Sequence, residues 1–375
     1  MKKVVWILFL VMGCIDPYVP SEIKPAGAIL VIDGHIETNG VSTIKLSRSQ
    51  NLLDDEEPIV ENGALVVLEN ETGGKFTLTN EGNGNYTLEP QSFGAGKYRL
   101  YVRSSTGREY ASEFVSVSDS PAIDSVSWKV NSDLGVDIYA NTHDDVKPKG
   151  YYRWKFIETW EYSSKYESVY VYNYQSRQAE LRTDNIFTCW RDNPSKDILI
   201  ASTNNLSRNL ISEFPLTSIT QKNERVRYTY SILVKQYSLT EEAHSYWSQL
   251  KKTTENLGTI FSPMPSQVAG NYQSITDPNE PVLGYFSIGA VSEKRIFINS
   301  LQLPRPGIYD IPAYEGCEQY ELLNQDVANF TGPFLLNGGI PNPNGPGIIG
   351  YYYSVIKCAD CREAGGTTVK PDFWP

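Results

Sequence analysis

The chain has 375 residues, with 33 Lys and Arg against 44 Asp and Glu, and its formal net charge is −11 at pH 7. This acidic balance argues against nucleic acid or an anionic membrane face as a partner. The 25 tyrosines and 7 tryptophans favour a β-rich protein, and the 3 histidines leave little material for catalytic triads or metal cages. Because the length exceeds what one hydrophobic core usually holds, we expect two domains.

The chain starts with a short basic segment and an apolar run, which together have the form of a secretory signal. Lys2 and Lys3 precede the apolar residues 4–12, and no further charge appears until Asp16. The run is too short to span a bilayer, which takes roughly 20 residues, so it is typical of a signal-peptide core. We therefore predict a signal peptide over residues 1–13.

The end of this segment predicts a lipid anchor. Val11-Met12-Gly13-Cys14 resembles the bacterial lipobox, in which an aliphatic residue and then a small residue precede an invariant cysteine. The resemblance implies that Cys14 is linked to diacylglycerol and becomes the mature N-terminus, where several acyl chains hold it at about 0.8 kcal/mol per buried methylene. The alternative is an ordinary secreted protein whose signal contains a cysteine. Residues 14–26 contain three prolines and are expected to form an extended tether.

Residues 27–118 predict an N-terminal β-sandwich domain. An apolar run over residues 28–32 precedes Asp33-Gly34, and Ile44 and Leu46 alternate with polar neighbours. About seven short strands at regular spacing, separated by turn signals, favour a sandwich. The order of strands resembles the immunoglobulin-like or transthyretin-like modules of exported bacterial proteins.

A second β-rich domain is predicted over residues 121–375. Within it, residues 150–174 carry an aromatic side chain at nearly every second position. This pattern fits a strand pair whose two faces are both covered, and it also fits a pair that leaves an aromatic face open for carbohydrate or a partner. On the second interpretation, Trp154, Trp160 and Tyr162 are candidate ligand or partner residues.

Two further features are expected in this second domain. Residues 176–225 are polar and irregular and are interpreted as an insertion. One amphipathic helix is predicted over residues 239–257, since Ser238-Leu239-Thr240-Glu241 has the form of a capping box and Ala243, Tyr246 and Trp247 fall on one face. The fold class is therefore mainly β, with two sandwich-like domains, a long insertion and one helix.

Two late stretches have apolar residues in a background of glycine and proline, Gly258 to Asp277 and Thr331 to Gly350. Loops at one end of a sandwich commonly carry binding residues. Packing of these stretches against the cysteine-containing region is an equal alternative. On the binding interpretation, Phe261, Met264 and Phe334 are candidate surface residues.

Four cysteines remain when Cys14 is set aside: Cys189, Cys317, Cys358 and Cys361. In an oxidising compartment an even number favours two disulfides, for which three connectivities are possible. We expect them to tie the tail back to Cys189 and Cys317. The alternatives are a four-thiolate zinc site, since Cys358 and Cys361 have the spacing of one zinc knuckle, and a redox motif.

The sequence contains none of the common catalytic or metal-binding motifs. No Gly-x-Ser-x-Gly, His-Glu-x-x-His, phosphate-binding loop or EF-hand spacing is present. His143-Asp144-Asp145 is weighed as a cation site, but a solvated turn is the favoured interpretation. Glu158 and Glu161 could be a glycosidase pair, although residues three apart on a strand point to opposite faces. We therefore predict no catalytic residues, no metal site and no cofactor.

Two blocks carry a resemblance to a known family. Residues 245–271, SYWSQLKKTTENLGTIFSPMPSQVAGN, and residues 358–374, CADCREAGGTTVKPDFW, resemble segments of the Bacteroidota outer-membrane lipoprotein family called domain of unknown function 4249. The resemblance covers nearly the whole mature chain. It implies a surface or outer-membrane lipoprotein whose partner is a TonB-dependent outer-membrane receptor, and it carries over no catalytic residue.

These observations lead to an expected function. We expect a non-enzymatic binding or accessory lipoprotein, held at the outer membrane by its lipid and exposed on the cell surface, that partners a TonB-dependent transporter in ligand capture or uptake. A surface structural or adhesive lipoprotein with β-sandwich spacers is the alternative, and a surface hydrolase is the third hypothesis.

Overall fold

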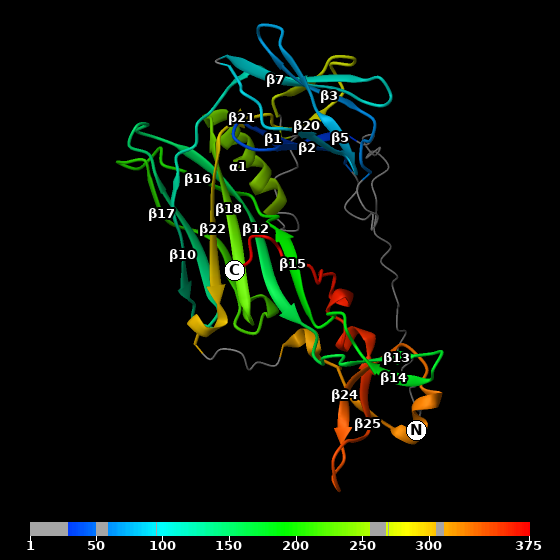
Figure 1. The fold of residues 1–375 in the computed structure, drawn as a ribbon. Helices are drawn as coiled ribbons and strands as arrows, with labels where there is room; N and C mark the ends of the chain where they lie inside the picture. Colours follow the sequence, from blue (N-terminus) through cyan, green and yellow to red (C-terminus); the bar gives the residue numbers. More distant parts are fainter. Residues whose placement is uncertain (1–28, 50–58, 95, 256–267, 269, 305–310) are drawn as a thin grey trace, which may run out of the picture.

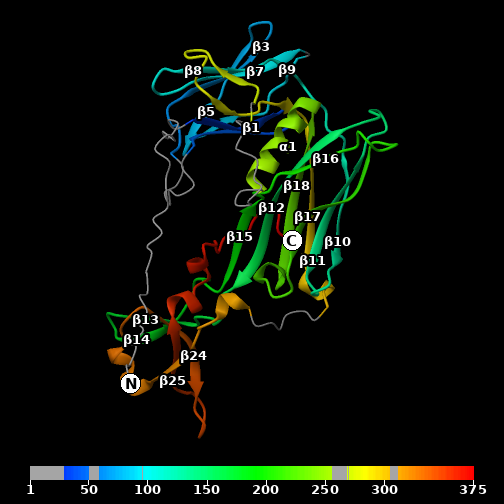
Figure 2. The ribbon, with the colours of Figure 1, turned by 180° about the vertical axis from the view of Figure 1, so that it is seen from behind.

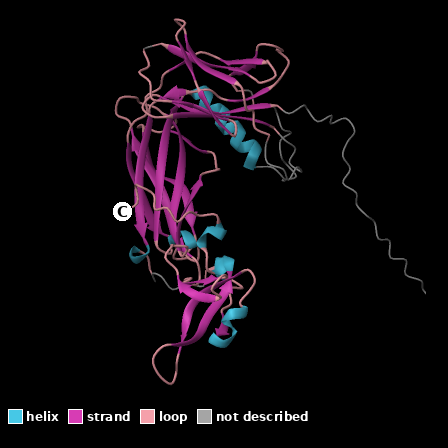
Figure 3. Ribbon diagram, turned by 45° about the vertical axis from the view of Figure 1, so that its right-hand side comes forward, coloured by secondary structure: helices cyan, strands magenta, loops and turns pink. Residues whose placement is uncertain are grey.

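The computed structural model describes residues 29–49, 59–94, 96–255, 268, 270–304 and 311–375. These residues form three β-built parts arranged in a row, as Figure 1 and the reverse view in Figure 2 show. We call them the N-terminal sandwich (residues 29–118 and 270–290), the central sandwich (119–163, 188–239 and 291–304) and the C-terminal lobe (164–187 and 311–364). The prediction of a mainly β fold with one amphipathic helix is confirmed, and the third part is additional to the two predicted domains (Figure 3).

The N-terminal sandwich consists of two six-stranded sheets. Its core comes from strand alternation: Leu30, Ile32 and Ile36 point inward from one sheet, and Leu100 and Val102 point inward from the other. The first sheet contains β1 (Leu30–Glu37), β2 (Ser42–Arg48), β5 (Thr79–Gly82), β6 (Asn85–Leu88), β20 (Val282–Gly284) and β21 (Ile288–Gly289). The second contains β3 (Leu65–Asn70), β4 (Lys75–Thr77), β7 (Lys97–Arg103), β8 (Glu109–Ser112), β9 (Val115–Ser116) and β19 (Tyr272–Ser274).

This sandwich differs from the predicted domain over residues 27–118, because strands from much later in the chain complete it. β19 pairs antiparallel with β8, and β20 and β21 pair parallel with β1. A parallel partner can lie anywhere along the chain, since its connection is long and has no turn signature. Sequence periodicity therefore predicted strands within residues 27–118 but did not show that residues 272–289 belong with them.

The central sandwich is formed by a three-stranded and a five-stranded sheet. The first contains β10 (Ile123–Val130), β11 (Val136–His143) and β17 (Leu210–Ile219). The second contains β12 (Tyr151–Ser163), β15 (Thr188–Pro194), β16 (Leu199–Ser202), β18 (Thr229–Leu239) and β22 (Val291–Asn299). The side chains of one face of β12 pack between the sheets, among them Trp154 and Phe156.

The prediction that residues 176–225 form an insertion is wrong for most of that range. β15 and β16 pair with β12, and β17 pairs with β11, so three strands of the central sandwich come from it. These strands lie at sheet edges, where one face and one backbone edge are open to solvent, so their side chains are largely polar. Polarity was therefore a poor guide to whether this segment belonged to the sandwich.

The predicted helix is present as α1 (Glu241–Glu255), and it is the only α-helix among the described residues. Its N-cap is Thr240, whose hydroxyl accepts a hydrogen bond of 3.2 Å from the N–H of Ala243. Ser238, the predicted capping residue, is instead part of β18. α1 packs on β12, β16 and β18, beneath the N-terminal sandwich (Figure 2).

The C-terminal lobe has two small sheets around a small core of Tyr172, Val327, Phe330 and Leu336. Its strands are β13 (Tyr170–Asn173), β14 (Gln178–Leu181), β23 (Tyr320–Leu323), β24 (Phe334–Pro341) and β25 (Ile348–Val355). The stretch 331–350, predicted as a loop, is mostly the β24–β25 hairpin. The short 3-10 helices of the described residues are η1 (Glu224–Val226), η2 (Ser300–Gln302), η3 (Pro312–Tyr314), η4 (Asn324–Asn329), η5 (Ile356–Cys358) and η6 (Cys361–Ala364).

Charged side chains join the N-terminal and central sandwiches. Lys235 of β18 lies 3.2 Å from a carboxylate oxygen of Glu37 and 2.8 Å from one of Glu293. Beside them, the ring of His35 meets that of Tyr237 edge to face, with 5.0 Å between centroids. This contact places β1, and with it β20, above the central five-stranded sheet and α1.

Candidate functional site

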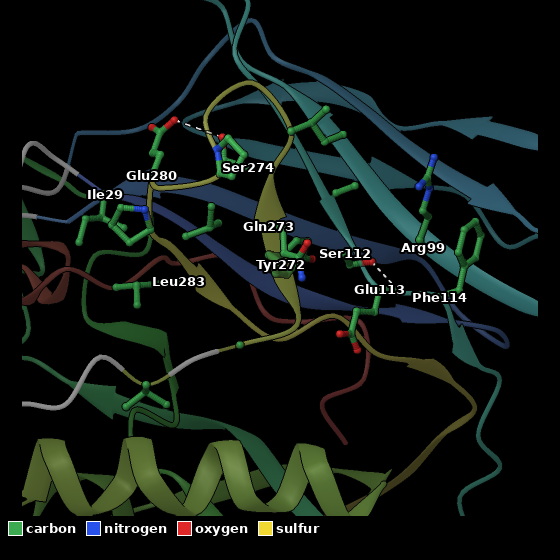
Figure 4. Close-up of a pocket in the computed structure, with 17 residues that line it drawn as sticks. Ile29, Arg99, Ser112, Glu113, Phe114, Tyr272, Gln273, Ser274, Glu280 and Leu283 are labelled. Atoms are coloured by element: carbon green, nitrogen blue, oxygen red, sulfur yellow. Dashed lines mark hydrogen bonds between the residues drawn. The ribbon is translucent and has the colours of Figure 1, made fainter.

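A cavity lies along an open side of the N-terminal sandwich, where the edge strands of its two sheets end. It measures about 710 Å³ and is lined from β19, from β20 and from the outer face of β7 and β8 (Figure 4). We call it the edge groove. β19 crosses its middle, Leu283 and Ile29 lie on one side, and Arg99 and Phe114 lie on the other.

The register of β19 decides which of its backbone groups face this groove. The N–H of Glu113 donates to the carbonyl of Asn271 at 2.8 Å, and the N–H of Ile275 donates to the carbonyl of Glu109 at 2.8 Å. Hydrogen-bonded pairs alternate along an antiparallel ladder, so Gln273 takes the next bonded position. The N–H and C=O groups of Tyr272 and Ser274 therefore point away from β8, towards the groove.

Some charged side chains of the edge groove already have partners. Glu280 accepts hydrogen bonds from Arg108 at 2.7 Å and from the Tyr110 hydroxyl at 2.9 Å. Burial, together with this hydrogen bond to Glu280, raises the pKa of the Tyr110 hydroxyl. Arg99 donates two hydrogen bonds to Glu69, at 2.9 and 2.8 Å. The hydrogen bonds hold the side chains of Arg99 and Glu280 in place along the groove.

Two other polar side chains of the groove remain available. The side chains of Glu113 and Gln273 are exposed, and neither makes a hydrogen bond or an ion pair to another described residue. The lining also includes apolar side chains, of which Ile275 is 51% exposed and Phe114 is 36% exposed. The groove thus offers free amide and carboxylate groups beside apolar contact area.

A second cavity of about 720 Å³ shares Glu113 and Gly270 with the first and extends to the beginning of α1. Glu241 and Glu242 contribute two more exposed carboxylates there. Hydrogen bonds from its own backbone N–H and from Thr240 lower the pKa of Glu242. The two cavities together form a continuous acidic surface.

Gly270 is required where the two cavities meet. A Cβ added at this position would collide with the carbonyl oxygen of Gly284, the last residue of β20. The side chain of Asn271 next to it accepts from the N–H of Phe286 at 2.7 Å and donates to its carbonyl at 2.9 Å. These contacts hold the start of β19 against the chain that follows β20.

The structure corrects the prediction for Trp154, Trp160 and Tyr162. All three lie on the inner face of β12 and are 0%, 5% and 3% exposed, so they are core residues and not a ligand surface. Trp154 stacks on Phe214, with 4.4 Å between ring centroids. The residues of β12 that alternate with these face α1 and the N-terminal sandwich, and they are also bulky. Arg153 is an example, since its guanidinium carbon lies 3.4 Å from the ring centroid of Trp247 in α1.

The other candidate surface residues have different outcomes. Phe334 is half-buried in the C-terminal lobe, where its ring meets that of Tyr353 at 5.3 Å, so it contributes to packing. Phe261 and Met264 lie outside the described residues, as does the lipidation candidate Cys14. The described part of the stretch Gly258 to Asp277 includes β19 and lines the edge groove.

The four later cysteines form two disulfides, which excludes a four-thiolate zinc site in this state. Cys189 of β15 is bonded to Cys361, and Cys317 is bonded to Cys358. The tail is therefore tied back to Cys189 and Cys317, with one of the three possible connectivities now assigned. Beyond them, Trp374 packs against Phe297 of β22, with 5.6 Å between ring centroids.

The residues weighed for catalysis are separated or already bonded. Glu158 is buried on the inner face of β12, where Arg225 donates to it at 2.7 Å and the Tyr230 hydroxyl donates at 2.8 Å, while Glu161 lies on the other face. His143 is exposed and bonds to Asp124 at 2.8 Å, a contact that raises its pKa. In the described part of the chain, no three His, Cys, Asp or Glu residues are placed to hold a metal ion.

The same part of the chain has no helix with the length and apolar character that a membrane span needs. Sequence reasoning did not identify the edge groove. The available signals were Gly270-Asn271, which must lie close to another strand, and the turn-forming residues 275–281 between β19 and β20. Neither shows which sheets these short strands join.

Comparison with known proteins gives a family and little else. A family model described as "Domain of unknown function (DUF4249)" matches residues 15–295. No curated protein matches the sequence.

Similar solved structures include a two fibronectin type-III domain segment from chicken tenascin, at 10% identity and a TM-score of 0.15, covering 56% of this chain and 95% of that one. Another is chicken CNTN1 FN1-FN3 domains, at 17% identity and a TM-score of 0.18, covering 56% and 60%. The chicken interferon gamma receptor alpha chain matches at 10% identity and a TM-score of 0.14, covering 57% and 90%. TM-scores this low carry no argument about this protein.

Proposed function

The chain belongs to the family called domain of unknown function 4249, and from this membership we propose that it is a lipid-anchored, non-enzymatic binding protein of the outer membrane. It partners a TonB-dependent transporter in capturing or taking up a ligand. The family resemblance is what supports the transporter, and the sequence of the first 14 residues is what supports the anchor.

The main support for this proposal is the predicted attachment of lipid at Cys14. Val11-Met12-Gly13-Cys14 follows a basic start and an apolar run, as in exported lipoproteins. Several acyl chains on one residue give stable anchoring, whereas a single chain gives only reversible binding. The prolines after Cys14 suit a tether that holds the sandwiches away from the membrane and leaves them exposed on the cell surface.

A binding role suits the body of the protein. Within the described part of the chain, the edge groove presents backbone groups of β19 that point away from β8, exposed polar side chains and exposed apolar residues on a β framework. Binding surfaces are commonly built in this way, from short segments held by packed sheets. Of the charged side chains weighed for catalysis, Glu158 forms a buried ion pair with Arg225.

The anchor is tested by expressing the full chain and the variant Cys14→Ser in a bacterium that processes lipoproteins. We expect the parent in the membrane fraction with a mature N-terminus at an acylated Cys14, and the variant in a soluble fraction. Mass spectrometry of the N-terminus and detergent partitioning provide the readout. An unmodified N-terminus beyond Cys14 in the parent would refute the anchor.

The partner is tested separately, in the native membrane. The tagged parent is solubilised in mild detergent and purified from the source cells, beside an unrelated tagged lipoprotein as the control. We expect a TonB-dependent receptor to co-purify with the parent and not with the control. If the parent purifies without a receptor, the transporter part of the proposal fails and the anchor remains.

The row of three β-built parts also suits a second function, a structural or adhesive surface protein whose sandwiches act as spacers (Figure 1). Length is the property that such a spacer needs. Shaving of intact cells with protease, followed by adhesion assays on Cys14→Ser cells, distinguishes the two functions. Unchanged ligand uptake with lost adhesion favours the spacer.

A further inference from the structure

We infer that the edge groove binds an extended polypeptide segment with basic side chains, which adds as a strand to the open edge of β19. The inference deepens the proposed function, since it takes the groove as the place where the protein binds. The identity of the transporter does not enter the argument.

The first step is the geometry of the edge. Among the described residues, β19 is the last strand of its sheet and pairs with β8 alone. The outward N–H and C=O groups of Tyr272 and Ser274 are two residues apart, which is the repeat with which an extended backbone offers its own hydrogen-bonding groups. Peptides that bind in this way gain affinity from main-chain hydrogen bonds.

The second step concerns protection of the edge. Natural sheets cover or charge their edge strands, often with lysine, because an open edge pairs with other chains. The side chain of Gln273 lies on the exposed face of β19 and carries no charge. Ile275, which follows β19, is 51% exposed. Leu283 lies on the side of β19 away from Arg99 and Phe114 and offers apolar contact to an added segment.

The third step is charge, which selects the kind of segment. Glu113, Glu241 and Glu242 line the continuous surface of the two cavities with exposed carboxylates. Arg99 is the one cationic side chain in the two linings, and it is bonded to Glu69. A lysine or arginine on the added strand is therefore attracted, and an acidic segment is repelled.

The length of this surface favours a polypeptide as the occupant. The two cavities share Glu113 and Gly270 and so continue from β20, along β19, to the first turn of α1. A small ligand is usually enclosed by its pocket on most sides. An extended segment of several residues can contact both cavities along their length. Its backbone can bond to the outward N–H and C=O groups of Tyr272 and Ser274.

The test uses the full-length protein and a capped six-residue peptide of alternating valine and lysine. Two control peptides are matched to it: one has N-methyl groups on alternate amides, and one has glutamate in place of lysine. We expect saturable binding of the parent peptide below about 1 mM, and at least about tenfold weaker binding of both controls, the loss of roughly 1.4 kcal/mol. Calorimetry provides the measurement.

Variants of the protein locate the binding. Ser274→Pro removes one outward N–H. Glu113→Gln removes a groove carboxylate, and Glu321→Gln removes an exposed carboxylate on β23 in the C-terminal lobe. We expect Ser274→Pro and Glu113→Gln to weaken binding of the parent peptide several-fold, and Glu321→Gln to bind it as the unchanged protein does.

Hydrogen exchange provides an independent readout, which is needed if Ser274→Pro fails to fold. Binding should slow exchange of the amides of Tyr272 and Ser274, since only these amides of β19 point into the groove. The inference is overturned if the N-methylated peptide binds as tightly as the parent, if the glutamate peptide does so, if exchange at these amides is unchanged, or if no peptide binds.

The outcomes are separable from those of the proposed function. Failure of peptide binding leaves acylation of Cys14 and co-purification of a receptor unaffected. Conversely, a soluble protein without acyl chains could still bind the peptide.

Discussion

The carboxylate of Glu158 accepts a hydrogen bond of 2.7 Å from the guanidinium of Arg225, and the carboxylate is buried on the inner face of β12. The Tyr230 hydroxyl and the side-chain amide of Asn193 donate to the same carboxylate, at 2.8 and 3.0 Å. Burial, followed by the charge of Glu158, raises the pKa of Tyr230 well above its usual value. Glu158 and its three donors therefore form a hydrogen-bonded ionic cluster inside the central sandwich.

Removing the cation from this cluster should be costly. Arg225→Met leaves a buried carboxylate without its charge partner, and we expect a loss of about 3–5 kcal/mol in the free energy of unfolding. Urea denaturation followed by tryptophan fluorescence measures it.

A matched control exists at the surface of the same sandwich. Lys129 and Glu213 form an exposed ion pair of 2.6 Å, and Lys129→Met should lower the free energy of unfolding far less than Arg225→Met does. Equal losses in the two variants would contradict the distinction drawn between a buried and an exposed pair.

The pH dependence of stability should report on His35 at the joint between the sandwiches. Burial, aided by the nearby Arg153, Lys155 and Lys235, lowers the pKa of His35 to about 4, although its hydrogen bond to the Gly289 carbonyl opposes this. In the unfolded chain the pKa is about 6.5. The unfolded state therefore binds a proton first, so this contribution is present above pH 6.5 and is lost as the pH falls towards 4.

The measurement compares the parent with His35→Gln across that window. The stability of the parent relative to the variant should decrease by at most about 3 kcal/mol between pH 7 and pH 4. His143→Gln is a control of opposite sign, because its partner Asp124 raises the pKa of His143. A difference between parent and His35→Gln that does not depend on pH would rule out this account.

The two disulfides should stabilise the folded chain to different extents. Cys189 and Cys361 are 172 residues apart, and Cys317 and Cys358 are 41 apart. A bridge that closes a longer loop removes more entropy from the unfolded chain, so removing the first pair should cost about 1 kcal/mol more than removing the second.

Thermal unfolding of the two double serine variants tests this order, and each loss should be about 2–4 kcal/mol. Cys14→Ser is the control, because Cys14 is assigned to the lipid. The expectation fails if adding a reductant leaves the unfolding temperature of the parent unchanged.

Trp154 should be essential to stability and not to binding at the edge groove. It is fully buried, stacks on Phe214 and donates to the side chain of Gln236 at 2.9 Å. Trp154→Ala should cost about 3–5 kcal/mol through lost burial and the cavity it leaves.

Tyr174→Ala provides the comparison, because Tyr174 is 65% exposed and its loss should cost less than about 0.5 kcal/mol. The variants are compared by urea denaturation. A Trp154→Ala protein of unchanged stability would show that this side chain is not part of the core.

Some predictions from sequence agree with the structure because they depend on local chemistry. Strand alternation placed Ile44 and Leu46 on one face of a strand, and the structure buries both. The helical spacing of Ala243 and Tyr246 identified α1, although the capping residue is Thr240 and not Ser238. In each case the relevant neighbours lie within a few residues along the chain.

Other predictions failed because they needed the third dimension. The aromatic pattern around Trp154 is compatible with an open face and with a covered one, and only the packing of α1 and the N-terminal sandwich decides which is present. The polarity of residues 176–225 reflected edge strands and not an insertion. Period-two alternation reports that two faces exist and not what covers them.

By itself, the sequence determined the mainly β fold, the single helix and the four cysteines available for bridging, because each follows from residue type and short spacing. Only the tertiary structure decided that Cys189 bonds to Cys361, and that β19 and β20 complete the first sandwich and open the edge groove. Pairings between residues so far apart in the chain leave no periodic signal, since they depend on how separate sheets bury their apolar faces together.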